Sequence, residues 1–266
     1  NTTTDFTSLY LPFDSDVNDD SPNSLSVTNN GVTISSAQSK FGGYSALFDG
    51  TNDYLSIPSN SSLVFGDEDF TIEYFIYTND DTLQSPFTHR DGSPGAGDWT
   101  MPLNRTVAGQ IEWYNGNYSI SSAVVSTTIS GGFSGGWHHI AVTRSGDIHR
   151  LFFDGVLKAS ATNSTTYGSG PTELHIGRDN YVGGRYYLDG YLDDFRVLKG
   201  YAKYTADFVP PTSAVGTSVS ETVNDLAVLY MPFDGTNTTS STPSSQTSLY
   251  LPFDSDLNDD SSNGHT

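Results

Sequence analysis

The chain has 266 residues, 35% of them hydrophobic and 13% aromatic, and a formal net charge of −20 with only 11 Lys and Arg. This length suits one large all-β domain with appendages, because such domains of roughly 200 to 250 residues stand as single units. The acidic balance argues against nucleic acid as a partner. The absence of cysteine excludes disulfides and thiolate metal ligands. No apolar run approaches the roughly 20 residues of a membrane span, so we expect no membrane insertion.

The first predicted strand lies in residues 9–21, L-Y-L-P-F-D-S-D-V-N-D-D-S. Pro12 has no backbone N–H to give to a neighbouring strand, which predicts a strand at a sheet edge. The loop that follows contains a run of acidic and amide side chains that resembles the start of an EF-hand. It lacks the glycine at the sixth position and the glutamate at the twelfth, so a solvated loop is the simpler interpretation. These side chains are Asp14, Asp16, Asn18, Asp19 and Asp20.

Further strands are predicted along the chain, because short apolar or aromatic runs alternate with turn residues. In the run Phe70–Thr78, Ile72 and Tyr74 share one face, which leaves Glu73 on the other. The only helical turn that we expect lies at 204–208. The predicted strands are 31–35, 45–48, 54–57, 70–78, 99–103, 110–114, 118–124, 137–144, 148–153, 156–161, 173–177 and 191–198.

The segment 137–161 gives the clearest pattern. Ile140 and Val142 alternate with more polar neighbours, which predicts a half-buried strand. A Ser-Gly-Asp turn follows, and Asp154-Gly155 is a strong hairpin signal before a third strand. Three antiparallel strands form a meander, so the chain is predicted to be all-β: a two-sheet antiparallel jelly-roll sandwich with an extended C-terminal linker.

Three residues of this meander carry separate expectations. Trp137 is expected to anchor the core of the sandwich. His138 and His139 are adjacent on a strand and therefore point to opposite faces, which argues against a shared metal or catalytic role.

An internal repeat sets the expected domain boundaries. The opening motif recurs as L-Y-M-P-F-D-G-T-N at 229–237 and almost letter for letter at 249–261. We expect a leader or linker at 1–6, one jelly-roll domain at 7–212, a Ser/Thr/Pro-rich linker with one short strand at 213–246, and the first strand of a further repeat at 247–266. The alternative is that this terminal strand inserts into the sheet of a neighbouring subunit.

Six motifs in order resemble the laminin G-like domains of the concanavalin A-like lectin/glucanase superfamily. The motifs are F-G-G-Y-S-A-L-F-D-G-T-N-D-Y-L-S-I-P (41–58), D-F-T-I-E-Y-F-I-Y (69–77), G-W-H-H-I-A-V-T-R-S-G (136–146), L-F-F-D-G (151–155), L-H-I-G-R (174–178) and G-Y-L-D-D-F-R-V (190–197). The segment K-G-Y-A-K-Y-T-A-D-F-V-P-P-T (199–212) is similar to the ending of members found in bacteriophage tail fibres and repetitive surface proteins. The resemblance implies a jelly roll of two curved sheets.

The resemblance also implies a structural calcium ion where the first and last strands meet. Asp194 matches the aspartate that holds the ion in related proteins, and Asp193, Gly43 and Asp14 are the other candidate ligands. Hard oxygen ligands, several of them backbone carbonyls, are what Ca²⁺ binds. The alternative is a solvated strand start in which Asp194 pairs with Arg196.

A glycan-binding surface is the second candidate site, because sugars are held by aromatic faces and a few planar polar groups. The alternative is that these aromatic residues belong to the core, and Trp113 and Tyr114 face opposite sides of their strand. The candidate residues are Trp99, Trp113, Tyr114, Asn115, Tyr181, Arg185 and Tyr186.

Catalysis has no support in the sequence. Glucanases of the superfamily carry the pattern E-x-D-x-E, and this chain has five glutamates but not that pattern. We therefore expect a non-catalytic, extracellular adhesion or display module on a virion or cell surface, calcium-stabilised and binding glycans or surface polysaccharide. Alternatives are a structural spacer or self-assembling fibre subunit, as a homo-oligomer or tandem array, and a polysaccharide hydrolase.

Overall fold

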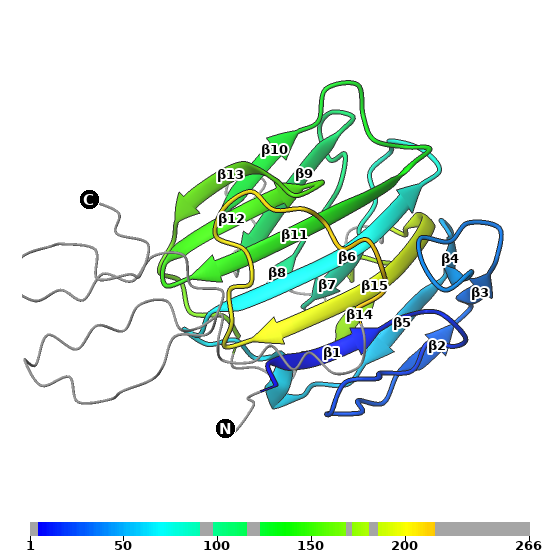
Figure 1. The fold of residues 1–266 in the computed structure, drawn as a ribbon, viewed down its shortest axis with the longest axis horizontal. Helices are drawn as coiled ribbons and strands as arrows, with labels where there is room; N and C mark the ends of the chain where they lie inside the picture. The colour runs from blue at the N-terminus through cyan, green and yellow to red at the C-terminus, as the bar shows by residue number, and fades with distance from the viewer. Residues whose placement is uncertain (1–4, 91–97, 116–122, 169–171, 181–185, 216–266) are drawn as a thin grey trace, which may run out of the picture. The chain divides into compact units, whose positions relative to one another are not determined.

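The computed structural model describes residues 5–90, 98–115, 123–168, 172–180 and 186–215. Within them the strands form two antiparallel sheets, which Figure 1 shows as two layers. The first sheet has eight strands: β13 (Val156–Thr162), β12 (Ile148–Phe153), β11 (Trp137–Ser145), β6 (Phe70–Thr78), β15 (Asp189–Lys199), β4 (Ser45–Asp49) and β3 (Thr33–Ser35) in this order, with β1 (Thr7–Leu11) also paired to β15.

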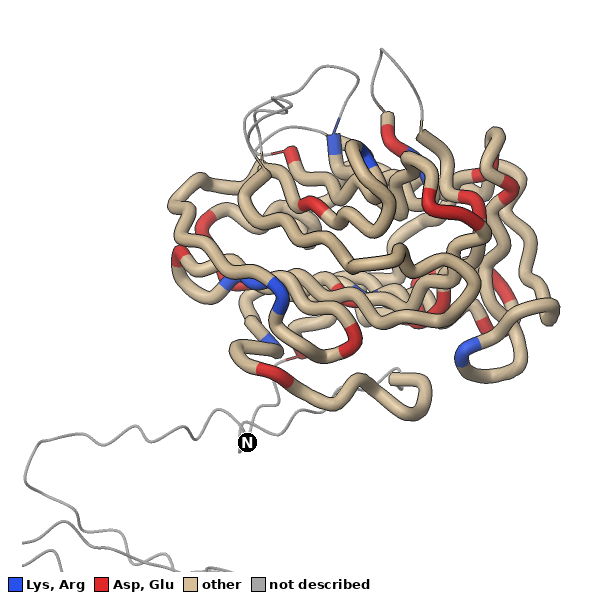
Figure 2. The backbone as a smooth tube through the Cα atoms, turned by 90° about the horizontal axis from the view of Figure 1, so that it is seen from above, with Lys and Arg blue, Asp and Glu red and all other residues tan. Residues whose placement is uncertain are grey.

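The second sheet has seven strands: β10 (Val125–Thr128), β9 (Gln110–Asn115), β8 (Trp99–Thr100), β7 (Phe87–His89), β14 (Leu174–Ile176), β5 (Tyr54–Ile57) and β2 (Thr28–Asn30) in this order. Figure 2 shows the two layers one above the other. The prediction of an all-β, two-sheet antiparallel sandwich is confirmed. The single helical element of the described residues is a short 3-10 turn, η1 (Ser61–Leu63). No helix in that part of the chain is long and apolar enough to cross a membrane.

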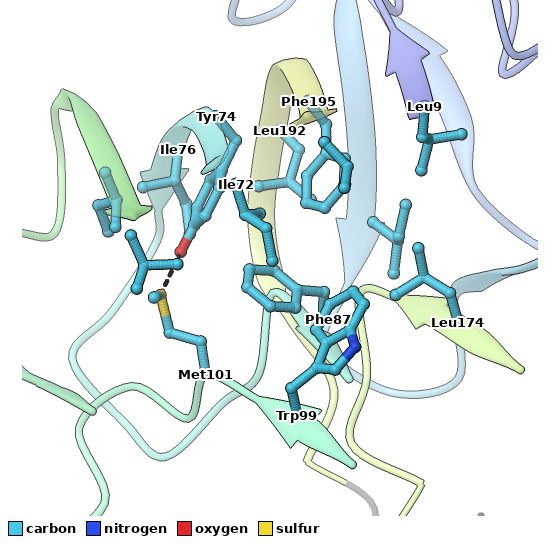
Figure 3. Packing of buried hydrophobic residues seen from close by; sticks show 14 of the residues in the cluster. Leu9, Ile72, Tyr74, Ile76, Phe87, Trp99, Met101, Leu174, Leu192 and Phe195 are labelled. Atoms are coloured by element: carbon cyan, nitrogen blue, oxygen red, sulfur yellow. Dashed lines mark hydrogen bonds between the residues drawn. The ribbon is translucent and has the colours of Figure 1, made fainter. Parts of the chain in front are cut away.

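The core lies between the sheets, because every strand turns alternate side chains inward. Ile72, Tyr74 and Ile76 of β6 face Phe87 and Trp99 of the other sheet, and all five are buried (Figure 3). The hydroxyl of a buried tyrosine needs a partner, and that of Tyr74 donates to Met101 Sδ at 3.1 Å. Aromatic side chains therefore fill much of the core, in which aliphatic residues are relatively few.

Residues 200–215, the C-terminal segment, cross the outer face of the eight-stranded sheet (Figure 1). The Thr143 hydroxyl donates to the Tyr204 carbonyl at 2.9 Å, and the ring of Tyr204 stacks on that of Phe208 at 3.5 Å. The Phe208 N–H donates to the Gly155 carbonyl at 2.8 Å. These contacts cover the middle of a sheet face that would otherwise be open to water.

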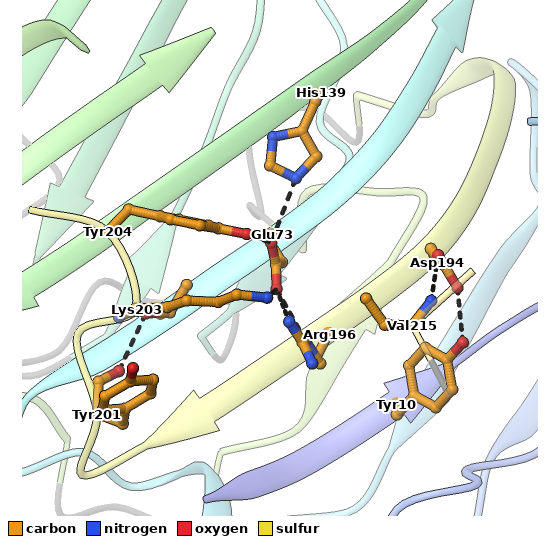
Figure 4. A network of polar contacts seen from close by, with 10 residues as sticks. Tyr10, Glu73, His139, Asp194, Arg196, Tyr201, Lys203, Tyr204 and Val215 are labelled. Atoms are coloured by element: carbon orange, nitrogen blue, oxygen red, sulfur yellow. Dashed lines mark hydrogen bonds and ion pairs between the residues drawn. The ribbon is translucent and has the colours of Figure 1, made fainter. Parts of the chain in front are cut away.

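A buried charge network lies between this segment and the sheet (Figure 4). Glu73 accepts hydrogen bonds from Arg196 and from the Tyr204 hydroxyl, the latter at 2.7 Å. His139 Nε2 lies 3.3 Å and Lys203 Nζ 3.4 Å from the same carboxylate. Glu73 points away from the core as the sequence predicts, yet it is 2% exposed because the C-terminal segment covers it. Its charge is stabilised chiefly by Arg196, which holds the pKa of Glu73 well below its usual range despite burial.

Two expectations for this face are wrong. Residues 204–208 form no helix, because the chain lies extended on the sheet, where the Lys203 N–H donates to the Thr71 hydroxyl at 2.8 Å. Trp137 is half-buried on the outer face and contacts the ring of Tyr77 instead of anchoring the core. His138 and His139 do diverge: His139 is buried beside Glu73, and His138 Nδ1 lies 2.7 Å from Asp154 Oδ2.

The strand predictions fail mainly in the seven-stranded sheet. β7 was not predicted, because its three residues, Phe87–His89, are too few to show a period of two. The strand predicted at 99–103 is confined to Trp99–Thr100. The one predicted at 118–124 falls largely outside the described residues, and β10 begins just after it. Strand β1 ends at Leu11, just before Pro12, and pairs on one side only within the described residues, which agrees with an edge position.

Candidate functional site

A row of polar side chains crosses the outer face of the seven-stranded sheet. Each has at least one core residue as its neighbour in sequence, so these side chains point away from the core. Each lies opposite the next across the strands, because Tyr114 pairs with Thr100, Thr100 with Thr88, Thr88 with His175, and His175 with Ser56. We call these five residues the polar row.

The polar row is buried along most of its length and opens at one end. Tyr114, Thr100, Thr88 and His175 are 0 to 2% exposed, whereas Ser56 on β5 is half-buried. The Thr88 hydroxyl has no hydrogen-bond partner among the described residues. A buried hydroxyl without a partner is costly, so a water molecule would be held at this position. The accessible end of the row is the part that a ligand in solution can reach.

Tyr54 lies at this accessible end, next to the buried side chains of His175 and Arg178. The Arg178 guanidinium lies 3.4 Å from the centre of the Tyr54 ring, and the ring of His175 meets that of Tyr54 edge to face at 5.8 Å. His175 Nε2 lies 3.1 Å from Glu173 Oε2, whose side chain is largely exposed. The half-buried Tyr54 therefore lies beside a cationic, an imidazole and a carboxylate group, which together can donate and accept hydrogen bonds.

A second tyrosine stands at the base of the neighbouring loop. The Asp179 N–H donates to the Tyr186 carbonyl at 3.1 Å, and Arg178 pairs with Tyr187 in an isolated bridge, so the two ends of this loop lie side by side. Arg90 Nε donates to Asp179 Oδ1 at 2.8 Å in a buried ion pair that fixes the base. Tyr186 is half-buried there. Tyr181 and Arg185 of the predicted glycan surface lie outside the described residues.

The other aromatic candidates do not form an exposed surface. Trp99 and Trp113 belong to the core, where their rings stack at 5.9 Å, and the expectation that they face a ligand is wrong. Tyr114 is buried on the outer face and donates to Glu112 Oε1 at 2.9 Å. Asn115 is buried and donates to Asn163 Oδ1 at 2.8 Å. The strand alternation correctly placed Trp113 and Tyr114 on opposite faces, but Tyr114 is buried on its own face.

The four predicted calcium ligands lie around the meeting of β1 and β15. The pairing of β15 with β6 shifts register between Asp193 and Arg196, and Asp194 has a positive φ of 50°. This bulge places the two carboxylates beside different neighbours. Asp194 accepts from the Tyr10 hydroxyl at 2.6 Å and from the Val215 N–H at 3.1 Å (Figure 4), so both of its oxygens are engaged.

Asp193 and Asp14, by contrast, each keep one buried oxygen without a partner in the described residues. One oxygen of Asp193 accepts from the N–H groups of Lys40 and Phe41, at 2.8 and 3.1 Å. Asp14 lies against the same turn, because a Cβ built on Gly42 would fall 1.6 Å from Asp14 Oδ1. A Cβ on Gly43 would meet nothing within 4 Å. The carboxylate oxygens without a partner in the described residues therefore belong to Asp14 and Asp193 and not to Asp194.

The pKa values of Asp193 and Asp194 indicate that too little positive charge lies near these two carboxylates. Burial and the charges of Asp194 and Asp14 together raise the pKa of Asp193 to about 7, against the lowering effect of the Phe41 and Lys40 N–H donors. Burial raises the pKa of Asp194 to about 6, while Tyr10, Val215 and Arg196 lower it. No cluster of three or more acidic or histidine side chains suited to a metal occurs in the described ranges. A cation here would therefore need backbone carbonyls beside the two carboxylates, which Ca²⁺ accepts.

Sequence reasoning missed the central residues of the sheet face. Thr88 lies on the unpredicted β7, and Tyr54, His175 and Arg178 have the pattern of ordinary strand and turn residues. One signal in the sequence could have indicated this face: His175 lies between the apolar residues Leu174 and Ile176, which places its side chain on the outer face of the strand. The alignment of these side chains across neighbouring strands depends on the register, which no local pattern contains.

Comparison with protein families finds a match of residues 49–202 to the family described as the concanavalin A-like lectin/glucanases superfamily. The comparison with curated proteins found no match. Among solved structures, this chain is similar to domain 4 of an extracellular GH43 arabinanase from Geobacillus stearothermophilus, in complex with arabinotriose. The identity is 19%, the TM-score is 0.56, and the match covers 74% of this chain and 94% of that domain.

Receptor-binding domains of clostridial toxins are also similar in fold. The binding domain of botulinum neurotoxin serotype D has 16% identity and a TM-score of 0.54 over 75% of this chain and 49% of that one. The binding domain of botulinum neurotoxin DC, in complex with rat synaptotagmin II, has 12% identity and a TM-score of 0.55 over 85% and 52%. This chain spans about half the length of these two toxin domains.

Proposed function

Because this chain belongs to the concanavalin A-like lectin/glucanase superfamily, we propose that it is a non-catalytic binding module that recognises a glycan on the outer face of its seven-stranded sheet. The observation that carries this proposal is the accessible end of the polar row, where Tyr54, Ser56 and Glu173 lie beside the buried His175 and Arg178. Structural neighbours support it at the level of fold, since one of them holds an oligosaccharide, arabinotriose. Function itself must come from the site, because the same fold serves many activities.

Each group at the accessible end has a task in this proposal. The Tyr54 ring, held on one face by the buried Arg178 guanidinium, offers its remaining apolar surface to the C–H face of a sugar ring. Glu173 and Ser56 accept and donate hydrogen bonds to sugar hydroxyls. The backbone pairing of β14 with β5 fixes the positions of these groups relative to one another. A shallow site of this kind binds weakly, so several modules in an array would raise the overall avidity.

The test is a glycan array followed by titration calorimetry with the best ligand. Tyr54→Ala should lower the affinity at least about tenfold, the usual cost of removing a central aromatic contact. Tyr191→Ala is the matched control, because Tyr191 is a half-buried tyrosine on the outer face of the other sheet and should leave binding unchanged. Equal binding by both variants, or no glycan bound at high protein concentration, would refute the proposal.

A calcium ion is the second part of the proposal. The buried oxygens of Asp14 and Asp193 that lack a partner support it, as does the turn 40–43 that both carboxylates contact. The ion would join β1 to β15 by neutralising charges that otherwise repel. Calcium should raise the melting temperature relative to a chelator, since a ligand of the folded state stabilises it. Asp193→Asn should abolish this rise, whereas the exposed Asp16→Asn should keep it. If the melting temperature does not depend on calcium, the proposal of a bound calcium ion is refuted.

We place the module on the exterior of a virion or cell. The repeated strand motif and the Ser/Thr/Pro-rich composition of residues 213–246 support this location, because both are typical of extended display proteins. An antibody against the module should label intact particles or unpermeabilised cells. Labelling only after permeabilisation would contradict the assignment.

A further inference from the structure

The strand motif at the two ends of the chain is a feature that glycan binding does not explain. Residues 7–21 and 247–261 have the same letters at every position except one, where Val17 is matched by Leu257. In the first copy this sequence forms β1 and the loop after it. The contacts of β1 therefore show what the second copy is able to bind.

The groove that β1 fills is apolar on its inner side. Leu9, Leu11 and Phe13 are 0% exposed and belong to the core between the sheets. Figure 3 shows Leu9 beside the buried residues of β15, including Phe195. β1 pairs antiparallel with β15, with Leu11 opposite Phe195. The second copy carries leucine, leucine and phenylalanine at the equivalent positions, residues 249, 251 and 253.

The polar contacts of β1 are repeated as well. The Tyr10 hydroxyl donates to Asp194 Oδ1 at 2.6 Å, which ties the outer side of β1 to β15. Asp19 accepts from the Tyr10 N–H at 3.0 Å and from the Ser21 N–H at 2.9 Å, and this closes the loop onto the strand. Tyrosine, aspartate and serine stand at 250, 259 and 261. All donors and acceptors that the strand brings to the groove are therefore present twice in the chain.

Both copies of the motif can make the same contacts in the groove. Which copy fills it therefore depends on the length of chain that connects each copy to the groove and on the local concentration of the second copy. β1 pairs on one side only within the described strands, so it can leave the sheet by breaking a single ladder of hydrogen bonds. We propose that the β1 groove of this domain also accepts residues 247–261 of a second copy of the chain. Copies of the protein would then be joined by strand exchange.

This inference goes beyond glycan binding and does not depend on it. It also differs from an ordinary sheet-edge contact, because the donor supplies core residues and not only a backbone ladder. Dense display on a surface would favour the exchange, since the donor concentration near each groove is then high.

The full-length chain tests the proposal through matched substitutions in the two copies. Leu9→Asp with Leu11→Asp puts two carboxylates into the core and prevents β1 from filling the groove. This variant should keep its fold by using the second copy, with native near-UV circular dichroism, and should form oligomers whose fraction rises with protein concentration in analytical ultracentrifugation.

The matched control is Leu249→Asp with Leu251→Asp, which leaves β1 intact and should remain folded without such oligomers. All four substitutions together should abolish the native near-UV signal. A synthetic peptide of residues 247–261 added to this fourfold variant should restore the signal, and the peptide with both aspartates should not.

Three results would overturn the proposal. The first is an unfolded Leu9→Asp/Leu11→Asp chain at every concentration, which would show that the second copy does not enter the groove. The second is a folded but strictly monomeric chain, which would place the donor in the same molecule. The third is a folded fourfold variant, because the groove would then need no strand.

Discussion

Glu73 is a carboxylate inside a covered sheet face, where a charge persists only when its partners compensate the loss of water. Arg196 supplies most of that compensation, with His139, Lys203 and the Tyr204 hydroxyl around the same two oxygens. The group therefore links β6, β11, β15 and the C-terminal segment at one point. Removing one partner leaves the remaining charge buried and uncompensated.

Arg196→Met should therefore destabilise the protein by about 3 to 5 kcal/mol, the usual cost of breaking one side of a buried pair. The double variant Glu73→Gln/Arg196→Met should cost less than Arg196→Met alone, because the orphaned charge is gone. Lys203→Met, whose side chain is 18% exposed, should have a much smaller effect. Urea unfolding measures all three, and a double variant less stable than the single one would contradict this account.

Two buried histidines, His89 and His149, make the stability of the protein depend on pH. Burial lowers the pKa of His89 to about 4, and burial together with the charge of Arg144 lowers that of His149 to about 4. The unfolded chain binds these protons near pH 6.5 and the native protein only near pH 4. Stability should thus be complete above about pH 6.5 and fall as the pH is lowered towards 4, by about 3 kcal/mol per histidine.

His89→Phe offers the check. His89 stacks on Trp99 at 4.8 Å, and both of its ring nitrogens lack a hydrogen-bond partner in the described residues, so a phenyl ring can replace it. The free energy of unfolding, measured in urea between pH 4 and 7, should depend less steeply on pH in this variant. The decrease in slope should correspond to about one proton fewer taken up on unfolding. An unchanged slope would mean that His89 does not titrate in this window.

The hairpin of β12 and β13 shows how one turn positions a whole segment. Asp154 and Gly155 both have positive φ, 50° and 75°. Asp154 Oδ1 accepts from the His139 N–H at 2.9 Å, which fixes the turn to β11. Gly155 meets the C-terminal segment so closely that a Cβ there would lie 2.0 Å from the Phe208 carbonyl oxygen. The turn thus determines how near the segment can approach the sheet.

Gly155→Ala should displace the C-terminal segment, because its Cβ meets backbone that cannot easily move. Gly146→Ala is the matched control, since Gly146 also has a positive φ, 56°, but a Cβ there meets nothing within 4 Å. Backbone strain alone should cost about 1 to 2 kcal/mol in the control, and Gly155→Ala should cost more. Limited proteolysis should cut the segment 200–215 faster in Gly155→Ala only. Equal effects in both variants would show that the contact with Phe208 is unimportant.

For the whole molecule, the described residues share one core between two sheets, so they should unfold in one cooperative transition. The chain divides into two compact units, Asn1–Thr222 and Val223–Thr266, and every residue of that core belongs to the first. The domain boundary expected from the sequence, at 212, remains a prediction.

A chain that ends at Thr222 should keep the melting temperature of the full-length protein, because it retains every described contact. A chain that ends at Lys199 lacks the segment over Glu73 and Phe152, and it should melt at a clearly lower temperature. Differential scanning calorimetry compares the two truncations. A loss of stability on removal of residues 223–266 would contradict the assignment of the core to the first unit.

The sequence alone determined the strands of the eight-stranded sheet, the turns at Gly146 and Asp154-Gly155, and the family, because these depend on local alternation and turn chemistry. It also placed Asp14 and Asp193 near each other through the resemblance. Only the tertiary structure decided that Trp99 and Trp113 are core residues, that Glu73 is covered, and that Thr88, His175 and Ser56 align. The physical reason is that burial and cross-strand alignment depend on register and on segments distant in sequence, which a local pattern does not record.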